Sequence, residues 1–246
     1  MASFLDIRSK SKYFYSMNDV ITLEQAKPAV QKKFMTGVYR WMVLALAISG
    51  VSAFFTAGSQ TALHLIFGNP VVFIGLIVGE LVLVFVLSAR IRDMKPSTAA
   101  FFFILYSIVN GITLSSIFLA YKISSIANIF AITALMFFGM SLYGMKTKSD
   151  LRSAGRYLMM GLIGILIASF MNLLFRSSGL DWLISIISVV VFTGLTAYDT
   201  QKLMTIGVYD DGSANFRKVS IIGALELYLD FINIFLSLLR LFGSRN

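Results

Sequence analysis

Four acidic residues lie inside long apolar stretches of the sequence, where a charged side chain is costly. Glu80 is midway along one stretch, Asp199 is near the end of another, and Glu226 and Asp230 lie four residues apart in the last. An ionisable group at the centre of a membrane-spanning helix costs about 2.5–3.5 kcal/mol on insertion scales and usually faces the interior of a bundle. These carboxyl groups are therefore the candidates for chemistry in this chain.

Carboxyl groups that meet in a low-dielectric core cannot both ionise cheaply, so such a pair shares a proton and changes its charge with pH. When deprotonated, the pair offers hard oxygen ligands that suit calcium rather than a soft metal. Glu226 and Asp230 are spaced i,i+4 and share one helix face. Arg90 is a candidate counter-ion, although with Arg92 it could equally mark the membrane interface.

Each candidate also has a purely structural interpretation. Glu80 could fix helix packing through an interior hydrogen bond, and Glu226 could reach water from the end of its helix. Asp199 is spaced to pair with Lys202 on one helix surface. Asp230 lies about ten residues into its apolar stretch, where water is hard to reach, so a structural role is least expected there.

Other kinds of functional site are excluded by the residue types present or by their spacing. The chain has no cysteine and a single histidine, His64, which excludes thiolate and multi-histidine metal sites. The glycines at Gly139 and Gly144 miss the Walker pattern, because Met145 precedes Lys146. The last apolar stretch has no lysine that could anchor a retinal. We therefore expect a protein that is not an enzyme and that holds no cofactor.

The composition indicates a membrane protein. Of 246 residues, 57% are hydrophobic and 13% charged, and the mean hydropathy is +0.81; a soluble chain would be roughly a quarter charged. Seven apolar stretches are each long enough to cross about 30 Å of hydrocarbon as a helix, which satisfies its own backbone polar groups. We predict an all-α polytopic fold over 36–246, with spans at about 40–58, 70–89, 98–121, 126–145, 157–175, 182–203 and 220–242.

The basic residues predict the topology. All but four of the 21 Lys and Arg lie in the N-terminal segment or in alternate joints between spans; the four are Lys122, Arg176, Arg240 and Arg245. This asymmetry predicts a cytoplasmic N-terminus. It also explains the net charge of +9 without nucleic-acid binding. For the seventh span, Arg240 and Arg245 favour a C-terminus inside the cell, whereas the length of the span favours a full crossing. The side of the membrane on which the C-terminus lies therefore stays open.

The N-terminal segment 1–35 is mostly polar and has no apolar period. It lacks the pattern of a cleaved signal peptide. We expect a cytosolic tail, either a solvated tether or a docking handle for a soluble partner.

The last fifty residues carry a family resemblance. The run TAYDTQK (Thr196–Lys202), a loop, and then GALELYLDFINIFLSLLRLFG (Gly223–Gly243) resemble the signature of the transmembrane Bax-inhibitor motif family, and in particular its bacterial members of the YccA and YetJ type. GELVLVFVLSARI (Gly79–Ile91) and YSIVNGITLSSIF (Tyr106–Phe118) match as well. The resemblance covers about residues 36–243.

The resemblance implies a bundle in which the seventh helix is surrounded by the other six. Members of this type are described as pH-sensitive calcium leak channels, in which aspartates of the sixth and seventh helices share protons and an arginine of the second helix engages them. By the motifs, the aspartates fall on Asp199 and Asp230 and the arginine latch on Arg90 or Arg92, with Arg90 preferred. Glu80 matches the acid of the second helix, whereas Glu226 is a variable position.

Three hypotheses follow. The first is a pH-gated calcium leak across the inner (plasma) membrane, with Asp199 and Asp230 as sensor and tentative calcium ligands, Arg90 as latch, and Glu80 and Glu226 as pore-side acids. The second, also implied by the resemblance, is a non-conducting modulator or substrate of a membrane AAA protease of the FtsH type. The third, for which the sequence offers less support, is a proton-coupled transporter of a small solute.

Overall fold

A computed structural model describes residues 17–91 and 93–246 of the chain, with side chains from Pro28 onward. In these ranges the chain is helical, and its nine helices are α2 (Met17–Ala57), α3 (Gln60–Phe67), α4 (Pro70–Arg90), α5 (Pro96–Leu114), α6 (Ser116–Ala120), α7 (Ile123–Lys146), α8 (Arg152–Phe175), α9 (Ser178–Gly207) and α10 (Ala214–Phe242).

Seven helical segments are long and apolar enough to cross a membrane, as predicted. They are Pro28–Ala57, Pro70–Arg90, Pro96–Ala120, Ile123–Lys146, Arg152–Phe175, Ser178–Gly207 and Ala214–Phe242. The third comprises α5 and α6, which are separated at Ser115, where the hydroxyl donates to the Ile112 carbonyl over 2.6 Å. The short helix α3 was not predicted. The protein is an all-α polytopic membrane protein.

The first helix begins much earlier than the apolar stretch suggested. The sequence placed a polar tail up to residue 35, but α2 is helical from Met17. Phe34 and Met35 belong to the core, with exposures of 1% and 4%, and the Gln31 amide donates to the Met204 carbonyl over 2.7 Å. The polar segment therefore ends in contacts with the bundle before residue 35. Of the predicted tail, residues 1–16 lie outside the described part of the chain, and its cytosolic location stays a prediction.

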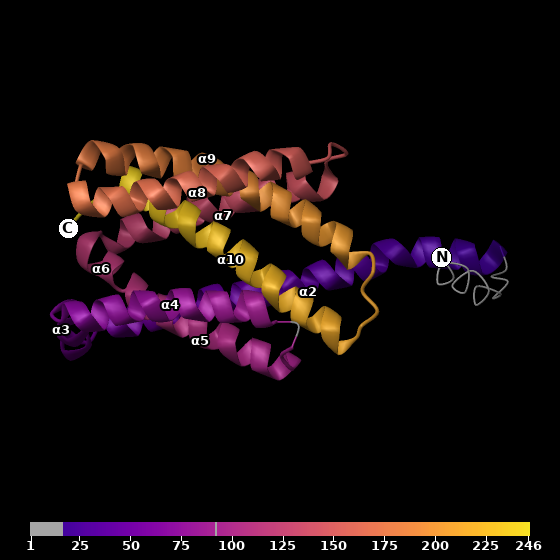
Figure 1. Cartoon of the computed structure of the whole chain (residues 1–246), viewed down its shortest axis with the longest axis horizontal. Coiled ribbons are helices and arrows are strands. Elements are labelled where there is room, and N and C mark those ends of the chain that lie inside the picture. The colour runs from indigo at the N-terminus through magenta and orange to yellow at the C-terminus, as the bar shows by residue number, and fades with distance from the viewer. Residues whose placement is uncertain (1–16, 92) are drawn as a thin grey trace, which may run out of the picture.

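The helices form two groups that α10 joins (Figure 1). In one group, α2 and α4 pack on α5; in the other, α7 and α8 pack on α9. The long α10 runs obliquely between them and packs against α2, α5, α7 and α9. It is the most buried span, which confirms its central position. The outer helices α4 and α8 pack mainly on α5 and α9 rather than on α10, so the inner ring around α10 has four helices.

Two glycines let helices touch within the groups. A Cβ at Gly111 of α5 would collide with the backbone and side chains of Ser49 and Ser52 on α2. A Cβ at Gly144 of α7 would collide with the backbone of Ala197 on α9. Small residues at helix contacts are the usual means of close packing in membranes, where apolar burial alone does not draw helices together.

The last helix crosses the whole bundle. Its C-terminal end lies opposite the start of α2 (Figure 1), where Ser244 accepts a backbone hydrogen bond from Lys122 over 3.0 Å. At this end the Arg240 guanidinium is 3.8 Å from the Asp181 carboxylate. This pairing gives Arg240 a local partner, so its charge no longer argues against a full crossing.

The joint before α10 is an ordered polar turn. Asp211 accepts a hydrogen bond from the Ser213 backbone over 2.8 Å, and the Ser213 hydroxyl caps α10 by accepting from Phe216. Hydrogen bonds from Ser213 hold the pKa of the exposed Asp211 carboxyl below its ordinary value. The turn fixes where α10 begins.

Candidate functional site

The contact between α9 and α10 brings two of the predicted acidic residues together around one lysine. Lys202 Nζ lies 2.8 Å from Glu226 Oε1 and 3.5 Å from Asp199 Oδ1. Asp199 and Lys202 are three residues apart on α9, which places them on one face, and Glu226 reaches them from α10. The structural interpretation of Asp199, a pairing with Lys202, is therefore present, and the same ammonium also holds Glu226.

Asp230 lies deeper than this ion cluster, one helical turn beyond Glu226 and near the middle of the 29-residue α10. Its side chain is buried, with 4% exposure, and its Oδ2 has no hydrogen-bond partner among the described residues. Glu226, four residues earlier on α10, lies on the same helix face and is bound by Lys202. A buried carboxyl with a spare acceptor atom beside other carboxylates is an arrangement suited to gaining or losing a proton.

The cluster has an opening at one end of the bundle. A cavity of about 200 Å³ is lined by Lys202, Gln201, Tyr198, Thr205, Ile206 and Arg152. Gln201 ties its rim to the α7–α8 joint, because its amide oxygen accepts from the Leu151 backbone over 2.9 Å and its amide nitrogen donates to Ser149 over 2.8 Å. The Lys202 side chain is 37% exposed. Lys202 is thus reached from the cavity, whereas Asp230 is buried.

The structure does not bring Arg90 to the aspartates. Arg90 is the last residue of α4, and its side chain is exposed. No ion pair joins it to Asp199 or Asp230 in the part of the chain that is described. The cation beside the carboxylates is Lys202 instead. The alternative latch, Arg92, lies outside the described residues.

Glu80 belongs to a separate polar chain on the other side of α10. The Asn110 amide donates to Glu80 Oε2 over 3.2 Å, and the Tyr228 hydroxyl donates to Asn110 Oδ1 over 2.8 Å. The same hydroxyl is 2.7 Å from Ser49 Oγ, which is 2.7 Å from the Ser107 carbonyl oxygen. Glu80 Oε1 is buried without a described partner. This chain links α4, α5, α10 and α2, so the structural interpretation of Glu80 as an interior hydrogen-bonding residue is realised.

Sequence reasoning missed three members of this polar chain. Asn110, Ser49 and Tyr228 are each buried, and each is a polar residue within an apolar stretch. Asn110 carries the signal that could have found it, since an amide in a membrane span needs an internal partner. Ser49 and Tyr228 carry weaker signals because serine can bond to its own helix and tyrosine is common at membrane interfaces.

The tentative calcium ligands do not form a multidentate site in this arrangement. No three His, Cys, Asp or Glu side chains in the described ranges come together as metal ligands would. Calcium takes six to eight oxygens, whereas here the Lys202 ammonium lies against two of the carboxylates. The described carboxylates are therefore paired with Lys202 and are not arranged as a calcium site.

Comparison with known proteins identifies the family. The family described as inhibitor of apoptosis-promoting Bax1 matches residues 31–246. The chain is 50% identical to the inner membrane protein YbhL of Escherichia coli K12, over 86% of this chain and 92% of YbhL. It is 44% identical to an uncharacterized protein of Borreliella burgdorferi, over 92% of this chain and 97% of the other. The chain therefore belongs to the Bax inhibitor-1 family.

Proposed function

We propose that this protein is a pH-sensitive calcium leak channel in which Asp199 and Asp230 take up and release the gating protons. The observation that carries the proposal is the placement of Asp230, which is buried at mid-bundle, has no partner for Oδ2 among the described residues, and lies one helical turn from Glu226 of the ion cluster. An unsatisfied buried polar atom is costly, and a carboxyl oxygen without a partner is free to take up a proton or to meet a cation.

Lys202 acts in this proposal as a built-in counter-ion. With the carboxylates ionised, its ammonium binds Asp199 and Glu226, and a divalent cation entering from the cavity competes for the same oxygens. Protonation of the carboxyls removes the attraction for both cations. Because Lys202 and Asp199 are on α9 while Glu226 and Asp230 are on α10, the protonation state changes the force that holds these two helices together.

Arg90 and Glu80 have further roles in this proposal. Arg90 serves as a latch only in a second arrangement, in which the end of α4 moves toward α9 and α10. Glu80 and Glu226 act as pore-side acids, and the spare Oε1 of Glu80 is the atom available to a passing cation. The name of the Escherichia coli relative, an inner membrane protein, supports the inner membrane as the location.

The test is calcium entry into proteoliposomes across pH 5 to 8 for the wild type, Asp199→Asn and Asp230→Asn. Asp181→Asn is the matched control, because Asp181 is also on α9 but about half exposed, at its other end. We expect a pH-dependent flux in the wild type and the control, and loss of the pH dependence in the two test variants. A wild type that is silent at every pH, or equal leaks in all four proteins, contradicts the proposal.

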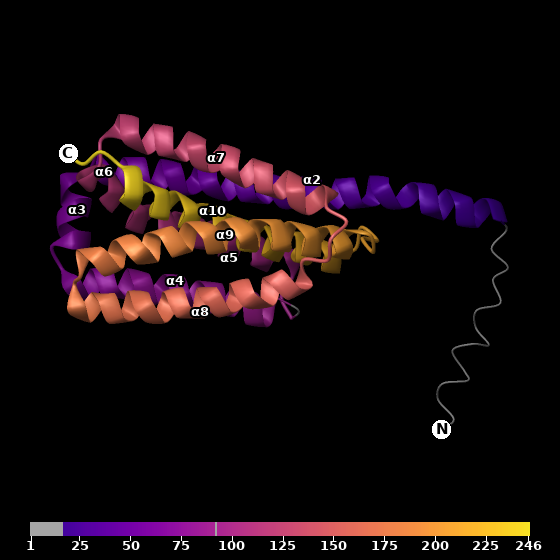
Figure 2. The same ribbon diagram turned by 90° about the horizontal axis from the view of Figure 1, so that it is seen from above.

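A second candidate is a non-conducting modulator or substrate of a membrane AAA protease of the FtsH type. The observation that favours it is the N-terminal part of α2, which extends beyond the bundle as a free helix (Figure 2) and is placed where a protease could grip it. The deletion that tests it should remove residues 1–27 only, because Gln31 and Phe34 hold the bundle. If this candidate is right, the deletion abolishes protease binding, and unchanged protease binding contradicts it. The leak proposed above predicts instead that calcium flux survives the same deletion, so the two readouts separate the two candidates.

A further inference from the structure

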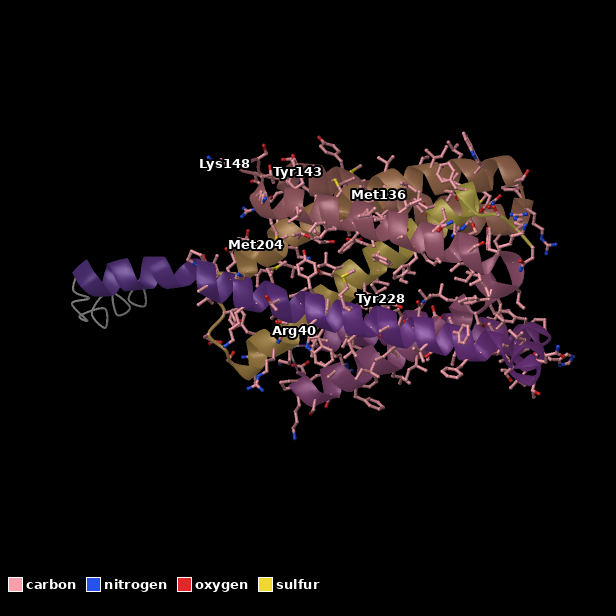
Figure 3. The ribbon with its side chains drawn as sticks, turned by 180° about the vertical axis from the view of Figure 1, so that it is seen from behind. Arg40, Met136, Tyr143, Lys148, Met204 and Tyr228 are labelled. Atoms are coloured by element: carbon pink, nitrogen blue, oxygen red, sulfur yellow. The ribbon has the colours of Figure 1, made fainter. Side chains whose placement is uncertain are left out.

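An apolar groove runs along the membrane-facing side of the bundle between α2 and α7. Its volume is about 740 Å³, and Phe231 of α10 forms part of its floor. Figure 3 looks onto this side, with α10 and its labelled Tyr228 visible between the two helices. The walls are apolar except for Tyr39 of α2 and Ser141 of α7. The groove plays no part in the ion cluster between α9 and α10.

Two small residues, Ala47 and Gly50, leave room on the α2 side of the groove. A Cβ built at Gly50 would meet no atom within 4 Å, and Ala47 lies one turn before it. A smaller cavity of about 90 Å³ shares Leu46, Gly50 and Phe130 with the groove and continues it toward α6. In a bilayer an open apolar groove is filled, since an unfilled one forfeits van der Waals contacts along its lining.

The length of the groove matches an acyl chain. On α2 it extends from Tyr39 to Val51, and at 1.5 Å per residue this is about 18 Å. One leaflet of hydrocarbon is about 15 Å thick, half of the 30 Å core. An acyl chain that entered at Tyr39 would thus run along the groove for the depth of one leaflet.

One end of the groove is polar and basic. The Tyr39 hydroxyl is buried and has no hydrogen-bond partner among the described residues, although Tyr39 lines the groove. At the same end α7 finishes with exposed Lys146, followed by Lys148, labelled in Figure 3. Lys32 lies two turns before Tyr39 on α2 and is exposed. An ester or phosphate oxygen would satisfy the hydroxyl, and the lysines favour a negative headgroup.

We propose that the groove between α2 and α7 binds one anionic phospholipid, with an acyl chain along α2 and α7 and the headgroup at Lys32, Lys146 and Lys148. Tyr39 donates to an oxygen of the glycerol ester or phosphate. Lipid tails are as apolar as the groove, so an acyl chain gains little free energy by moving from the bulk bilayer into the groove. The selectivity therefore comes from the headgroup and from Tyr39, and it weakens as salt screens the lysines.

The test is native mass spectrometry of the full chain after release from nanodiscs of equal parts phosphatidylglycerol and phosphatidylcholine. Gly50→Phe fills the groove, and Gly139→Phe is the matched control, because Gly139 is also open and exposed but lies on α7 outside the groove. We expect one phosphatidylglycerol retained by the wild type and by the control, and its loss from Gly50→Phe. Tyr39→Phe should weaken retention about fivefold, the value of one hydrogen bond.

Two results would overturn the proposal. Equal retention by Gly50→Phe and Gly139→Phe would mean that the lipid is not in the groove. Equal retention of phosphatidylglycerol and phosphatidylcholine would mean that the basic end selects no headgroup. Neither readout depends on calcium flux, so the lipid site and the proposed leak are tested separately.

Discussion

Tyr228 and Asp230 lie two residues apart on α10 and point to opposite sides of the helix. The Tyr228 hydroxyl bonds to Asn110 and lies against Ser49, on the side of α2 and α5. Asp230 shares a helix face with Glu226, which contacts Lys202 of α9. Two residues correspond to about 200° around a helix, so the two polar clusters lie back to back. A rotation of α10 that disturbs one cluster must disturb the other.

The polar chain through Tyr228 should stabilise the bundle. Tyr228→Phe removes the hydroxyl and leaves Asn110 Oδ1 without its partner, with the ring contacts to Phe103 and Tyr106 retained. We expect the free energy of unfolding to fall by about 1–3 kcal/mol, the cost of an unsatisfied buried group. The measurement is unfolding in detergent micelles. Tyr143→Phe is the control, since Tyr143 is exposed, and equal losses in both variants would contradict the expectation.

Removal of the cation between α9 and α10 should leave two carboxylates facing each other. Lys202→Gln keeps a polar side chain, one atom shorter, but removes the charge that holds Asp199 and Glu226. We expect a loss of about 1–3 kcal/mol near neutral pH, between the values for exposed and buried ion pairs. The loss should shrink in acid, where protonated carboxyls no longer need a counter-ion.

A double-mutant cycle checks this interpretation of Lys202. If Lys202 acts through Glu226, Glu226→Gln should cost much less in the Lys202→Gln background than in the wild type. Strictly additive losses would mean that the 2.8 Å contact contributes no coupling. Unfolding curves at two pH values, one near neutral and one acidic, separate the electrostatic part from any packing change.

The close approach of α7 and α9 should make Gly144 intolerant of any side chain. In Gly144→Ala the added methyl group collides with the Ala197 backbone, so the helices must separate and the protein should lose stability. Gly139→Ala, on the same helix, adds a methyl group in open space and should be neutral or stabilising by up to about 1 kcal/mol through helix propensity. The measurement is the midpoint of thermal unfolding of both variants. Similar midpoints would show that α7 and α9 are not in contact at Gly144.

Cysteine labelling can show on which side of the membrane each joint lies, because the chain has no natural cysteine. Ser149→Cys lies in the α7–α8 joint and Ser244→Cys beyond α10, and both positions are exposed. If the basic joints are cytoplasmic, a membrane-impermeant maleimide added to intact cells should label Ser244→Cys alone. Ser149→Cys should react only after permeabilisation, and the reverse pattern would invert the predicted orientation.

The sequence was sufficient to predict the membrane spans but not the residues at which they end or the side-chain contacts between them. Length and hydropathy predicted seven crossings, since a bilayer imposes both. The start of α2 at Met17 was missed because a polar helix outside the bilayer has no apolar period, and the interruption at Ser115 has neither glycine nor proline to mark it. The contacts of Lys202 with Glu226 and of Tyr228 with Asn110 depend on how α10 is rotated against its neighbours, which no local pattern encodes.

The central position of α10 also bears on the order in which the protein is made. Of the described helices α10 leaves the ribosome last, after the two groups that it joins. Until it inserts, Asn110 lacks the Tyr228 hydroxyl and Lys202 lacks Glu226, so polar groups of the earlier spans face lipid or one another. A nascent chain that stops before residue 214 carries six of the seven spans but lacks the helix around which they assemble.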